Sequence, residues 1–305
     1  MTEKSDNLVS SFVFEDSFFS SGNRVHDEVR DFIKKHRIDV RKSLGQNFLV
    51  REEPLSLACQ AAEVSLQDLV LEIGPGPGTL TRRLAQKAGA VVAVELDYQI
   101  AQALKKEFSQ ISNTTIIHGD ALKIDPQHIC QEYGRGLNFK VVANIPYYIT
   151  SALLRHYLSG LVKPRVMVML MQKEVALQAT SKNNRSLLSL SVQYFGFPEV
   201  MGLVPKDFFY PIPKVDSALL RISIHNEKPI KVEEEEFFTL ARHAFSSARK
   251  TLLNSLSSSL KIDKDAMSVL LLAAGAEFPN IRAGALNFAQ WQKLYDTLRG
   301  KVEWK

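Results

Sequence analysis

Apolar segments of strand length alternate with amphipathic segments of helix length from about residue 65 to residue 171. The apolar segments are rich in Val, Ile and Leu, which is typical of strands buried on both faces of a sheet. The expected strands are 68–73, 91–95, 115–118, 140–143 and 166–171, and the expected helices are 79–87, 100–108 and 151–158. Because strand–helix–strand crossovers share one hand, this alternation predicts an α/β fold with a doubly wound parallel sheet.

Two further strand-like segments, 200–204 and 218–224, follow without a convincing helix between them. They predict a hairpin-like addition at one edge of the sheet. From about residue 233 the pattern is helical to the end, whereas residues 1–33 are acidic and lack clear periodicity. We therefore expect a flexible extension over residues 1–29, an α/β domain over 30–228 and a small all-helical domain over 229–305.

The composition is that of a globular protein. Of 305 residues, 45% are apolar and 23% are charged, and no apolar run approaches the roughly 18 residues that a membrane-spanning helix needs. The two cysteines, Cys59 and Cys130, form no paired motif, so we expect a cytoplasmic protein without disulfides. The seven histidines show no ligand spacing, and we expect no metal site.

A glycine-rich loop, from Glu72 to Thr79, joins the first predicted strand to a helix. Its two prolines remove N–H donors, so the loop suits a neutral or cationic ligand better than a pyrophosphate. Glu95 ends the second strand and is placed to accept hydrogen bonds from ribose hydroxyls, while Asp120, after the third strand, is placed to accept one from an adenine amine. Together these features predict a cofactor that contains adenosine.

The fourth strand runs into Asn144-Ile145-Pro146-Tyr147-Tyr148, which resembles the motif of S-adenosylmethionine-dependent adenine-N6 methyltransferases. An adenine amine is a poor nucleophile, and the Asn144 oxygen with a main-chain carbonyl is suited to hold its hydrogens and aim its nitrogen. Tyr147 would stack on the flipped base, and Phe209 would cover the other face of the base. A sulfonium is already an activated methyl donor, so this chemistry needs no metal.

Long motifs in the chain resemble the ribosomal small-subunit (16S) RNA adenine N6,N6-dimethyltransferases over roughly residues 30 to 300. These motifs are Arg41-Lys42-Ser43-Leu44-Gly45-Gln46-Asn47-Phe48-Leu49, the glycine loop, the Asn144 motif and Pro211 to Ala218. The resemblance implies a Rossmann-like class I S-adenosylmethionine-dependent methyltransferase fold. It also implies dimethylation of two adjacent adenines near the 3′ end of 16S rRNA, within a 30S subunit or its precursor, and we expect a monomer.

The same resemblance implies roles for individual residues. Asn47 and Leu49 would close over S-adenosyl-L-methionine, Gly74, Glu95 and Asp120 would contact it, and Asn144 would lie where cofactor and target base meet. The chain departs from the family pattern at two positions of the helical domain, where Ala248 replaces an arginine and Gly284 replaces a glutamate. These departures leave the details of RNA docking open.

The positive charge of the chain is concentrated in one segment. Residues 34–51 contain six basic residues and one acid, while the other 287 residues contain 32 of each sign. The net charge of +5 therefore resides in that segment, and we expect Lys34, Lys35 and Arg37 to contact RNA phosphate. Residues from Phe237 onward, with ten basic residues and five acids, would make a second contact.

Three alternatives remain at this point. An NAD-dependent oxidoreductase fits the first strand–loop–helix unit and Glu95, but it does not account for the Asn144 motif. A non-catalytic RNA-binding assembly factor fits the fold, although the intact motif argues against it. A large-subunit RNA methyltransferase shares the chemistry, but the C-terminal helices favour the small-subunit type.

Overall fold

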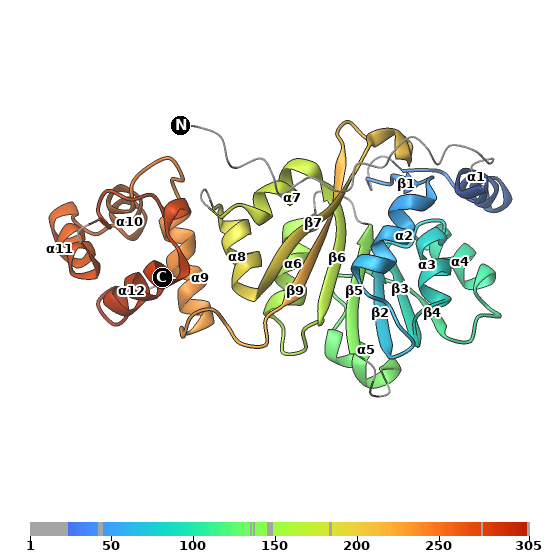
Figure 1. Cartoon of the computed structure of the whole chain (residues 1–305), viewed down its shortest axis with the longest axis horizontal. Coiled ribbons are helices and arrows are strands. Elements are labelled where there is room, and N and C mark those ends of the chain that lie inside the picture. Colours follow the sequence, from blue (N-terminus) through green and yellow to red (C-terminus); the bar gives the residue numbers. More distant parts are fainter. Residues whose placement is uncertain are drawn as a thin grey trace. The chain divides into compact units, whose positions relative to one another are not determined.

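A computed structural model of the chain describes residues 24–41, 45–134, 136, 138–144, 149–182, 185–275 and 277–303 (Figure 1). The described residues divide into two compact units. The first contains residues up to Leu177 together with Gly196–Ile224, and the second contains Gln178–Phe195 together with the residues from His225 onward. No helix in the described ranges is long and apolar enough to cross a membrane.

The first unit is built on a seven-stranded sheet with the order β4-β3-β2-β5-β6-β9-β7. Its strands are β2 (Asp68–Ile73), β3 (Ala90–Glu95), β4 (Thr114–His118), β5 (Asn138–Asn144), β6 (Val166–Gln172), β7 (Gly196–Val204) and β9 (Ser217–Ile224). Strands β2 to β6 are parallel, whereas β9 is antiparallel to both β6 and β7. The predicted α/β fold and its antiparallel edge pair are therefore confirmed.

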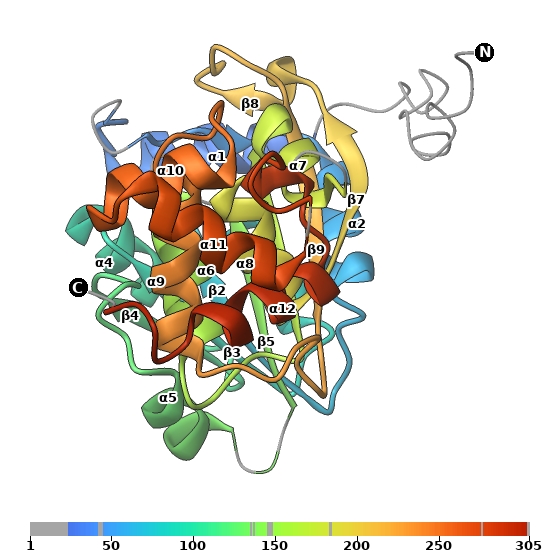
Figure 2. The same ribbon diagram turned by 90° about the vertical axis from the view of Figure 1, so that its left-hand side faces the viewer.

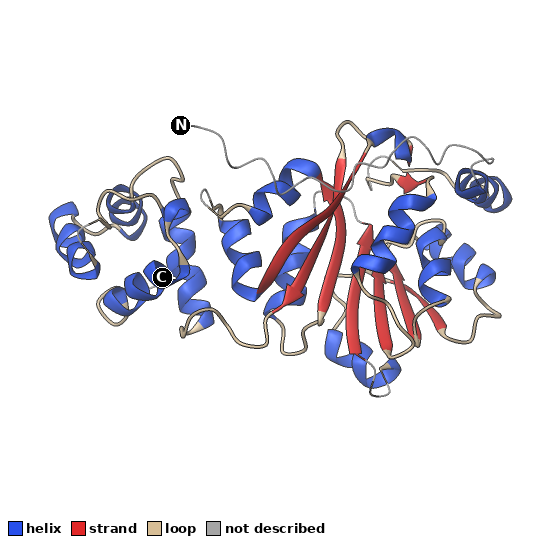
Figure 3. Cartoon of the chain, viewed as in Figure 1, coloured by secondary structure: helices blue, strands red, loops and turns tan. Residues whose placement is uncertain are grey.

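The strand order reverses between β2 and β5, because the chain proceeds from β2 to β3 and β4 and then returns to β5 on the other side of β2. In open α/β sheets, ligands bind in the crevice outside the carboxyl ends of the strands at such a switch point. Helices flank the sheet, which Figure 3 shows in red. They are α2 (Glu52–Ala61), α3 (Thr79–Ala85), α4 (Tyr98–Glu107), α5 (Pro126–Tyr133), α6 (Thr150–Ser159) and α7 (Lys173–Thr180).

Two short strands form a separate ribbon. Strand β1 (Phe48–Leu49) pairs antiparallel with β8 (Phe209–Tyr210), so that Phe48 lies opposite Tyr210 and Leu49 opposite Phe209. Segments some 160 residues apart in the sequence thus meet at one place beside the sheet. The sequence pattern did not indicate this ribbon, since two-residue strands leave no periodic signal.

Helix α1 (Arg24–His36) precedes the ribbon. Its apolar face, made by Val25, Val29 and Phe32 at helical spacing, is 1–6% exposed. The sequence interpretation assigned residues up to 29 to a flexible extension, whereas α1 begins at Arg24 and is packed against the unit. Residues 1–23 lie outside the described residues.

The second unit contains α8 (Leu187–Phe195), α9 (Glu234–Phe245), α10 (Leu252–Leu260), α11 (Lys264–Ala274) and α12 (Phe288–Leu298) (Figure 2). Trp291, Phe237 and Tyr194 are fully buried, and the Tyr194 and Phe237 rings stack with centroids 5.3 Å apart. Residues 178–195 belong to this unit, although the sequence interpretation placed them in the α/β domain. Tyr194 joins the unit through rings more than 40 residues away, which local patterning does not reveal.

Candidate active site

A pocket of about 260 Å³ lies in the α/β unit, at the carboxyl ends of β2, β3, β4 and β5. It is lined by every described residue that the sequence analysis assigned to the site: Asn47, Leu49, Gly74, Glu95, Asp120, Asn144 and Phe209. The structure therefore brings these seven side chains or backbones together from six separate segments. Tyr147, the eighth predicted site residue, lies outside the described residues, as do Ile145, Pro146 and Tyr148.

The N–H groups of the three glycines in the loop are all engaged within the protein. The N–H of Gly74 donates to the Val94 carbonyl at 3.0 Å, and that of Gly78 donates to the Pro75 carbonyl at 2.9 Å. The N–H of Gly76 donates to Glu95 Oε2 at 3.2 Å, and Pro75 and Pro77 have none. A pyrophosphate needs converging N–H donors, so this loop fits a cofactor without one.

Gly76 lies against the ribbon that covers the pocket. Its φ is +53°, and a Cβ placed there would come within 2.8 Å of Phe48 Cδ1 on β1. Glycine is therefore required at position 76 for two reasons: the backbone is left-handed, and the Phe48 ring leaves no room for a side chain. Strand β1 and the glycine loop therefore pack directly on each other and close one side of the pocket. We call the segment from Gly45 to Leu49, which contains β1, the covering segment.

We expect Gly76→Ala to lower the affinity for S-adenosylhomocysteine at least tenfold, because Phe48 has to move and displace the covering segment. Gly136→Ala is the matched control: its φ is +82°, but nothing lies within 4 Å of an added Cβ. It carries the backbone strain of about 1 kcal/mol without the collision. Isothermal titration of both variants separates the two effects, and equal affinities would contradict this account.

Glu95 connects the sheet to the loop. Its carboxylate is 7% exposed, with Oε1 accepting a hydrogen bond from the Asp97 N–H at 2.8 Å and Oε2 accepting the one from Gly76. Burial raises the pKa of Glu95, and the two backbone donors oppose that rise. Each oxygen accepts one backbone N–H and keeps acceptor capacity for a further hydrogen bond, so the predicted contact with ribose hydroxyls is geometrically open.

Asp97 and Gln46 were missed at the sequence level. Asp97 is 3% exposed, and its Oδ1 accepts hydrogen bonds from the N–H groups of Gln99 and Ile100 at the start of α4. Gln46 donates to Asp97 Oδ2 at 3.3 Å, and its own Oε1 accepts from the Arg41 N–H at 2.7 Å. This chain of contacts ties the segment that precedes β1 to the strand end that carries Glu95. An aspartate two residues after Glu95, at a helix start, was the available signal.

Glu72 was also missed. It is 1% exposed, it lines the pocket, and neither of its carboxylate oxygens has a hydrogen-bond partner among the described residues. Burial raises the pKa of Glu72 to about 8, the Thr81 hydroxyl close to the carboxylate opposes that rise, and the nearby Glu95 adds to it. A buried carboxylate without a partner is suited to a cationic ligand, which supplies the missing charge. An acid inside a fully buried strand, two residues before Gly74, was the signal in the sequence.

Asn144 and Phe209 border the other end of the pocket. Asn144 is the last residue of β5, where it pairs with Leu170 of β6, and it is half-buried. Phe209 is 3% exposed and pairs with Leu49 in the ribbon, so secondary structure holds it in place. Asp120 accepts a hydrogen bond from the Leu122 N–H at 3.0 Å through Oδ1, which leaves Oδ2 available.

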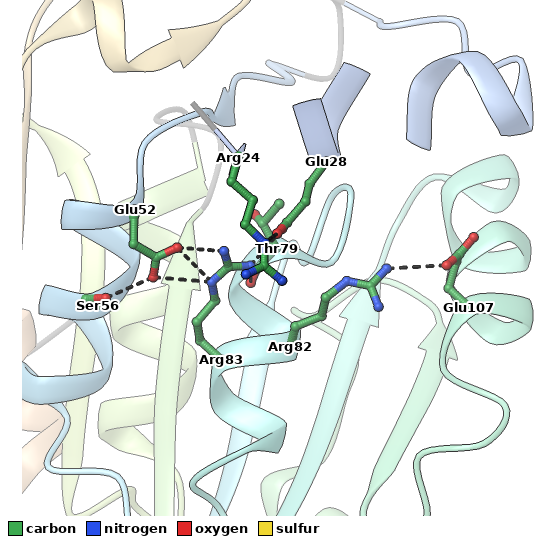
Figure 4. A network of polar contacts seen from close by, with 8 residues as sticks. All are labelled: Arg24, Glu28, Glu52, Ser56, Thr79, Arg82, Arg83 and Glu107. Carbon is green, nitrogen blue, oxygen red and sulfur yellow. Dashed lines mark hydrogen bonds and ion pairs between the residues drawn. The ribbon is translucent and has the colours of Figure 1, made fainter. Parts of the chain in front are cut away.

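An arginine on α3 anchors helix α1 beside this pocket (Figure 4). The Arg83 guanidinium lies 2.9 Å from Glu28 of α1 and 2.6 Å from Glu52 of α2, and it donates to the Thr79 carbonyl at 2.9 Å. Its side chain is only 15% exposed. Since α3 follows the glycine loop directly, Arg83 fixes α1 and α2 relative to that loop.

A second anchor is Glu107 at the end of α4. Lys35 donates to its Oε1 at 2.6 Å, His36 lies 2.9 Å from the same atom, and Arg82 donates to Oε2 at 3.3 Å. These partners, Lys35 foremost, lower the pKa of Glu107 to about 2. Lys35 thus forms an ion pair with Glu107 although its side chain stays 67% exposed, whereas no ion pair of Lys34 or Arg37 occurs in the described part of the chain. The contact of these three side chains with RNA phosphate stays a prediction.

We expect Arg83→Ala to lower the free energy of unfolding by about 2 kcal/mol, because two partly buried carboxylates and a carbonyl lose their donor. Arg24→Ala is the matched control. Arg24 also contacts Glu28, at 3.3 Å, but it is 89% exposed, and exposed ion pairs contribute little. Urea denaturation of both variants checks the difference, and equal losses would show that Arg83 is not an anchor.

The described residues hold no group of three or more His, Cys, Asp or Glu side chains able to bind a metal ion. The parallel sheet with an antiparallel edge pair, the glycine loop and the carboxylates at successive strand ends define a class: the protein has the Rossmann-like fold of class I S-adenosylmethionine-dependent methyltransferases. The unpartnered Glu72 in the pocket fits the positive charge of that cofactor.

Comparisons with known proteins narrow the class. The family model of ribosomal RNA adenine dimethylase matches residues 37–284. Ribosomal RNA small subunit methyltransferase A of Dehalococcoides mccartyi strain CBDB1 is 42% identical over 269 residues, which cover 88% of this chain and 91% of that protein. The protein of the same name from Alkaliphilus oremlandii is 35% identical over 280 residues, which cover 90% of this chain and 97% of that protein.

Two solved structures are also similar to this chain. The crystal structure of the 23S rRNA methyltransferase ErmE has a TM-score of 0.63 and 27% identity, and covers 82% of this chain and 99% of its own. A dimethyladenosine transferase from Plasmodium falciparum shares the fold, with a TM-score of 0.73 and 24% identity. The match covers 85% of this chain and 100% of that protein. The chain belongs to the ribosomal RNA adenine dimethylase family. It is therefore an rRNA adenine dimethyltransferase whose methyl donor is S-adenosyl-L-methionine, and the oxidoreductase and non-catalytic alternatives fall away.

Proposed function

We propose that the protein dimethylates the N6 amines of two adjacent adenines near the 3′ end of small-subunit rRNA. It acts as a monomer in the cytoplasm, on a 30S subunit or its precursor. The observation that carries this proposal is the position of Asn144, which ends β5 in the same pocket as the carboxylates of Glu72, Glu95 and Asp120. One cavity thus combines acceptors for an adenosine and a cation with an acceptor for an amine.

The cofactor residues follow from this arrangement. Glu95 would accept from the ribose hydroxyls, Asp120 from the adenine amine, and Glu72 would face the positively charged methionine end. Gly74 would let the backbone approach the cofactor, and Asn47 and Leu49 would cover it. The covering segment is held locally, since Asn47 donates to the Gly45 carbonyl at 3.0 Å.

The proposed binding mode of the target adenine depends on Asn144. When bound, S-adenosylmethionine supplies an activated methyl group. Asn144 would accept a hydrogen of the target amine and so direct the nitrogen lone pair away from the adenine ring. Phe209 would pack against one face of the base, and Tyr147 is proposed to stack on the other face. Positioning of this kind can supply about 7–11 kcal/mol of the barrier reduction.

The helical unit is proposed to dock the RNA. A pocket of about 530 Å³ lies within this unit, and the described residues that line it include four arginines and no acid. They are Arg185, Arg242, Arg249 and Arg282, and the positions of the two departures from the family pattern, Ala248 and Gly284, line the same pocket. Guanidinium groups without neighbouring carboxylates suit phosphate oxygens, so the departures leave a basic pocket in place.

We expect Arg249→Ala combined with Arg282→Ala to weaken binding of undermethylated small subunits and to reduce the slope of log affinity against log salt by about 2. Affinity for S-adenosylhomocysteine stays unchanged, because the cofactor pocket lies in the other unit. Lys293→Ala, an exposed basic residue outside the pocket, is the control. An unchanged salt slope in the double variant would contradict a role in RNA docking.

A titration tests the cofactor part of the proposal. The wild-type protein should bind S-adenosylhomocysteine and show no saturable binding of NAD, because the N–H groups of the loop's glycines are engaged within the protein and its prolines have none. Tight binding of NAD alone would overturn the proposal. A second measurement separates the two rRNA classes: methyl transfer to large-subunit RNA but not to small subunits would favour the activity of the ErmE type.

A further inference from the structure

A second pocket, of about 340 Å³, lies in the α/β unit between helix α1 and the β1–β8 ribbon. Its wall is apolar and is formed by Val29, Ile33 and Val50. The other residues that line it are Tyr210 and three basic residues, His26, Arg30 and Lys34. No acid among the described residues lines this pocket, and none of its lining residues lines the pocket assigned to the cofactor.

The two pockets are adjacent through the ribbon. Successive side chains of a strand point to opposite faces, so Phe209 and Tyr210 separate the pockets although their Cα atoms are only about 3.8 Å apart. Phe209 is 3% exposed and lines the first pocket, whereas Tyr210 is 49% exposed and lines the second. A base next to Phe209 would therefore have its neighbour in the RNA strand within reach of Tyr210.

The charge of the second pocket is distributed unequally. Arg30 shares its charge with Asp27 at 3.0 Å and with Asp31 at 3.4 Å. Lys35, which follows Lys34 in the chain, forms an ion pair with Glu107 at the end of α4. Lys34 lines the pocket, and its ammonium takes part in no ion pair with a described residue. Lys34 is thus the main source of unshared positive charge beside Tyr210.

We propose that this pocket binds a nucleotide that flanks the target adenine in the RNA strand. The base stacks on Tyr210 against the apolar wall, and the phosphate is held by Lys34 and Arg30. An exposed aromatic ring beside basic side chains is how proteins hold unpaired nucleotides, because every base has a face to stack and every nucleotide carries a phosphate. The inference rests on the proposed RNA substrate and extends the binding surface beyond the methylated base.

The experiment measures the dissociation constant of undermethylated small subunits in the presence of S-adenosylhomocysteine. Tyr210→Ala should weaken binding about tenfold, and Tyr210→Phe should bind like the wild type because the ring is kept. Lys34→Ala should weaken binding and reduce the salt slope by about 1. Phe197→Ala and Lys105→Ala, which alter an exposed aromatic ring and an exposed lysine elsewhere in the unit, are the matched controls.

Affinity for S-adenosylhomocysteine should be the same in all variants, which shows that the fold and the cofactor pocket are intact. Wild-type affinity for subunits in Tyr210→Ala and Lys34→Ala would overturn the inference, whereas absent methyl transfer by the wild-type protein would refute the proposed function instead. Residues 1–23 contain four acids, one basic residue and four phenylalanines, and are a competing occupant. If the effect of Tyr210→Ala disappears when these residues are deleted, the pocket serves the chain itself and the inference is also overturned.

Discussion

Asn144→Ala lowers kcat for methyl transfer about 10²–10³-fold, while the affinity for S-adenosylhomocysteine changes little. The expected size is that of removing one oriented hydrogen-bonding group from a catalytic site. Asn144 ends β5 and lines the pocket, and its oxygen is the acceptor proposed to orient the target amine. Without that acceptor the nitrogen lone pair stays delocalised into the adenine ring, so the loss falls on the chemical step. Single-turnover methylation of undermethylated small subunits measures it.

Asn144→Asp is the informative companion, because it keeps an acceptor oxygen at the same position and should retain more activity than Asn144→Ala. Titration with S-adenosylhomocysteine serves as the control for folding. If these variants changed only the affinity for the cofactor and preserved kcat, Asn144 would be a cofactor-binding residue. That result would contradict its proposed role in orienting the target amine.

Affinity for S-adenosylmethionine rises with pH, by up to tenfold per unit, and levels off above about pH 8. In the cofactor-free protein burial raises the pKa of Glu72 to about 8, so Glu72 is protonated at lower pH. A cation beside the carboxylate favours its ionised form, and binding therefore releases a proton. Calorimetric titrations between pH 6 and pH 8 in buffers of different ionisation enthalpy measure both the affinity and the proton release.

The contribution of Glu72 to the free energy of unfolding of the cofactor-free protein decreases with rising pH, whereas the affinity for the cofactor increases. Unfolded, Glu72 ionises near its ordinary value of 4.5, whereas folded it stays protonated up to about pH 8. The unfolded state therefore binds fewer protons in this window, and the contribution of Glu72 to stability decreases as the pH rises from 4.5 to 8. Glu72→Gln should remove the pH dependence of binding, weaken S-adenosylmethionine and stabilise the cofactor-free protein at pH 8. A variant with wild-type affinity and pH profile would show that Glu72 does not face the cofactor.

Among the residues of the pocket, those at the ends of strands were the easiest to predict from the sequence. Glu95, Asp120 and Asn144 each end or follow a strong apolar run, and parallel strands necessarily bring such residues to one edge. Alternation along the chain is a local signal, so the parallel sheet and its edge pair were also predictable.

The parts that the sequence did not reveal depend on contacts between distant segments. Arg83 and Glu28 are 55 residues apart, and Lys35 and Glu107 are 72 apart, so the anchoring of α1 leaves no local pattern. A lysine in a basic segment looks the same in the sequence whether or not it forms an ion pair, so the contact between Lys35 and Glu107 was not predictable. Glu72 carries a local signal, an acid within an apolar strand, but its lack of partners becomes visible only in three dimensions.

The most direct test of the central claim is a mass measurement of the modified nucleosides. Undermethylated small subunits are incubated with the protein and S-adenosylmethionine, and their rRNA is digested and analysed. The account predicts N6,N6-dimethyladenosine at two adjacent positions near the 3′ end, in equal amounts, formed about 10²–10³-fold more slowly by Asn144→Ala. Methyl groups on another base or another atom, or no incorporation by a wild-type protein that binds the cofactor, would contradict it.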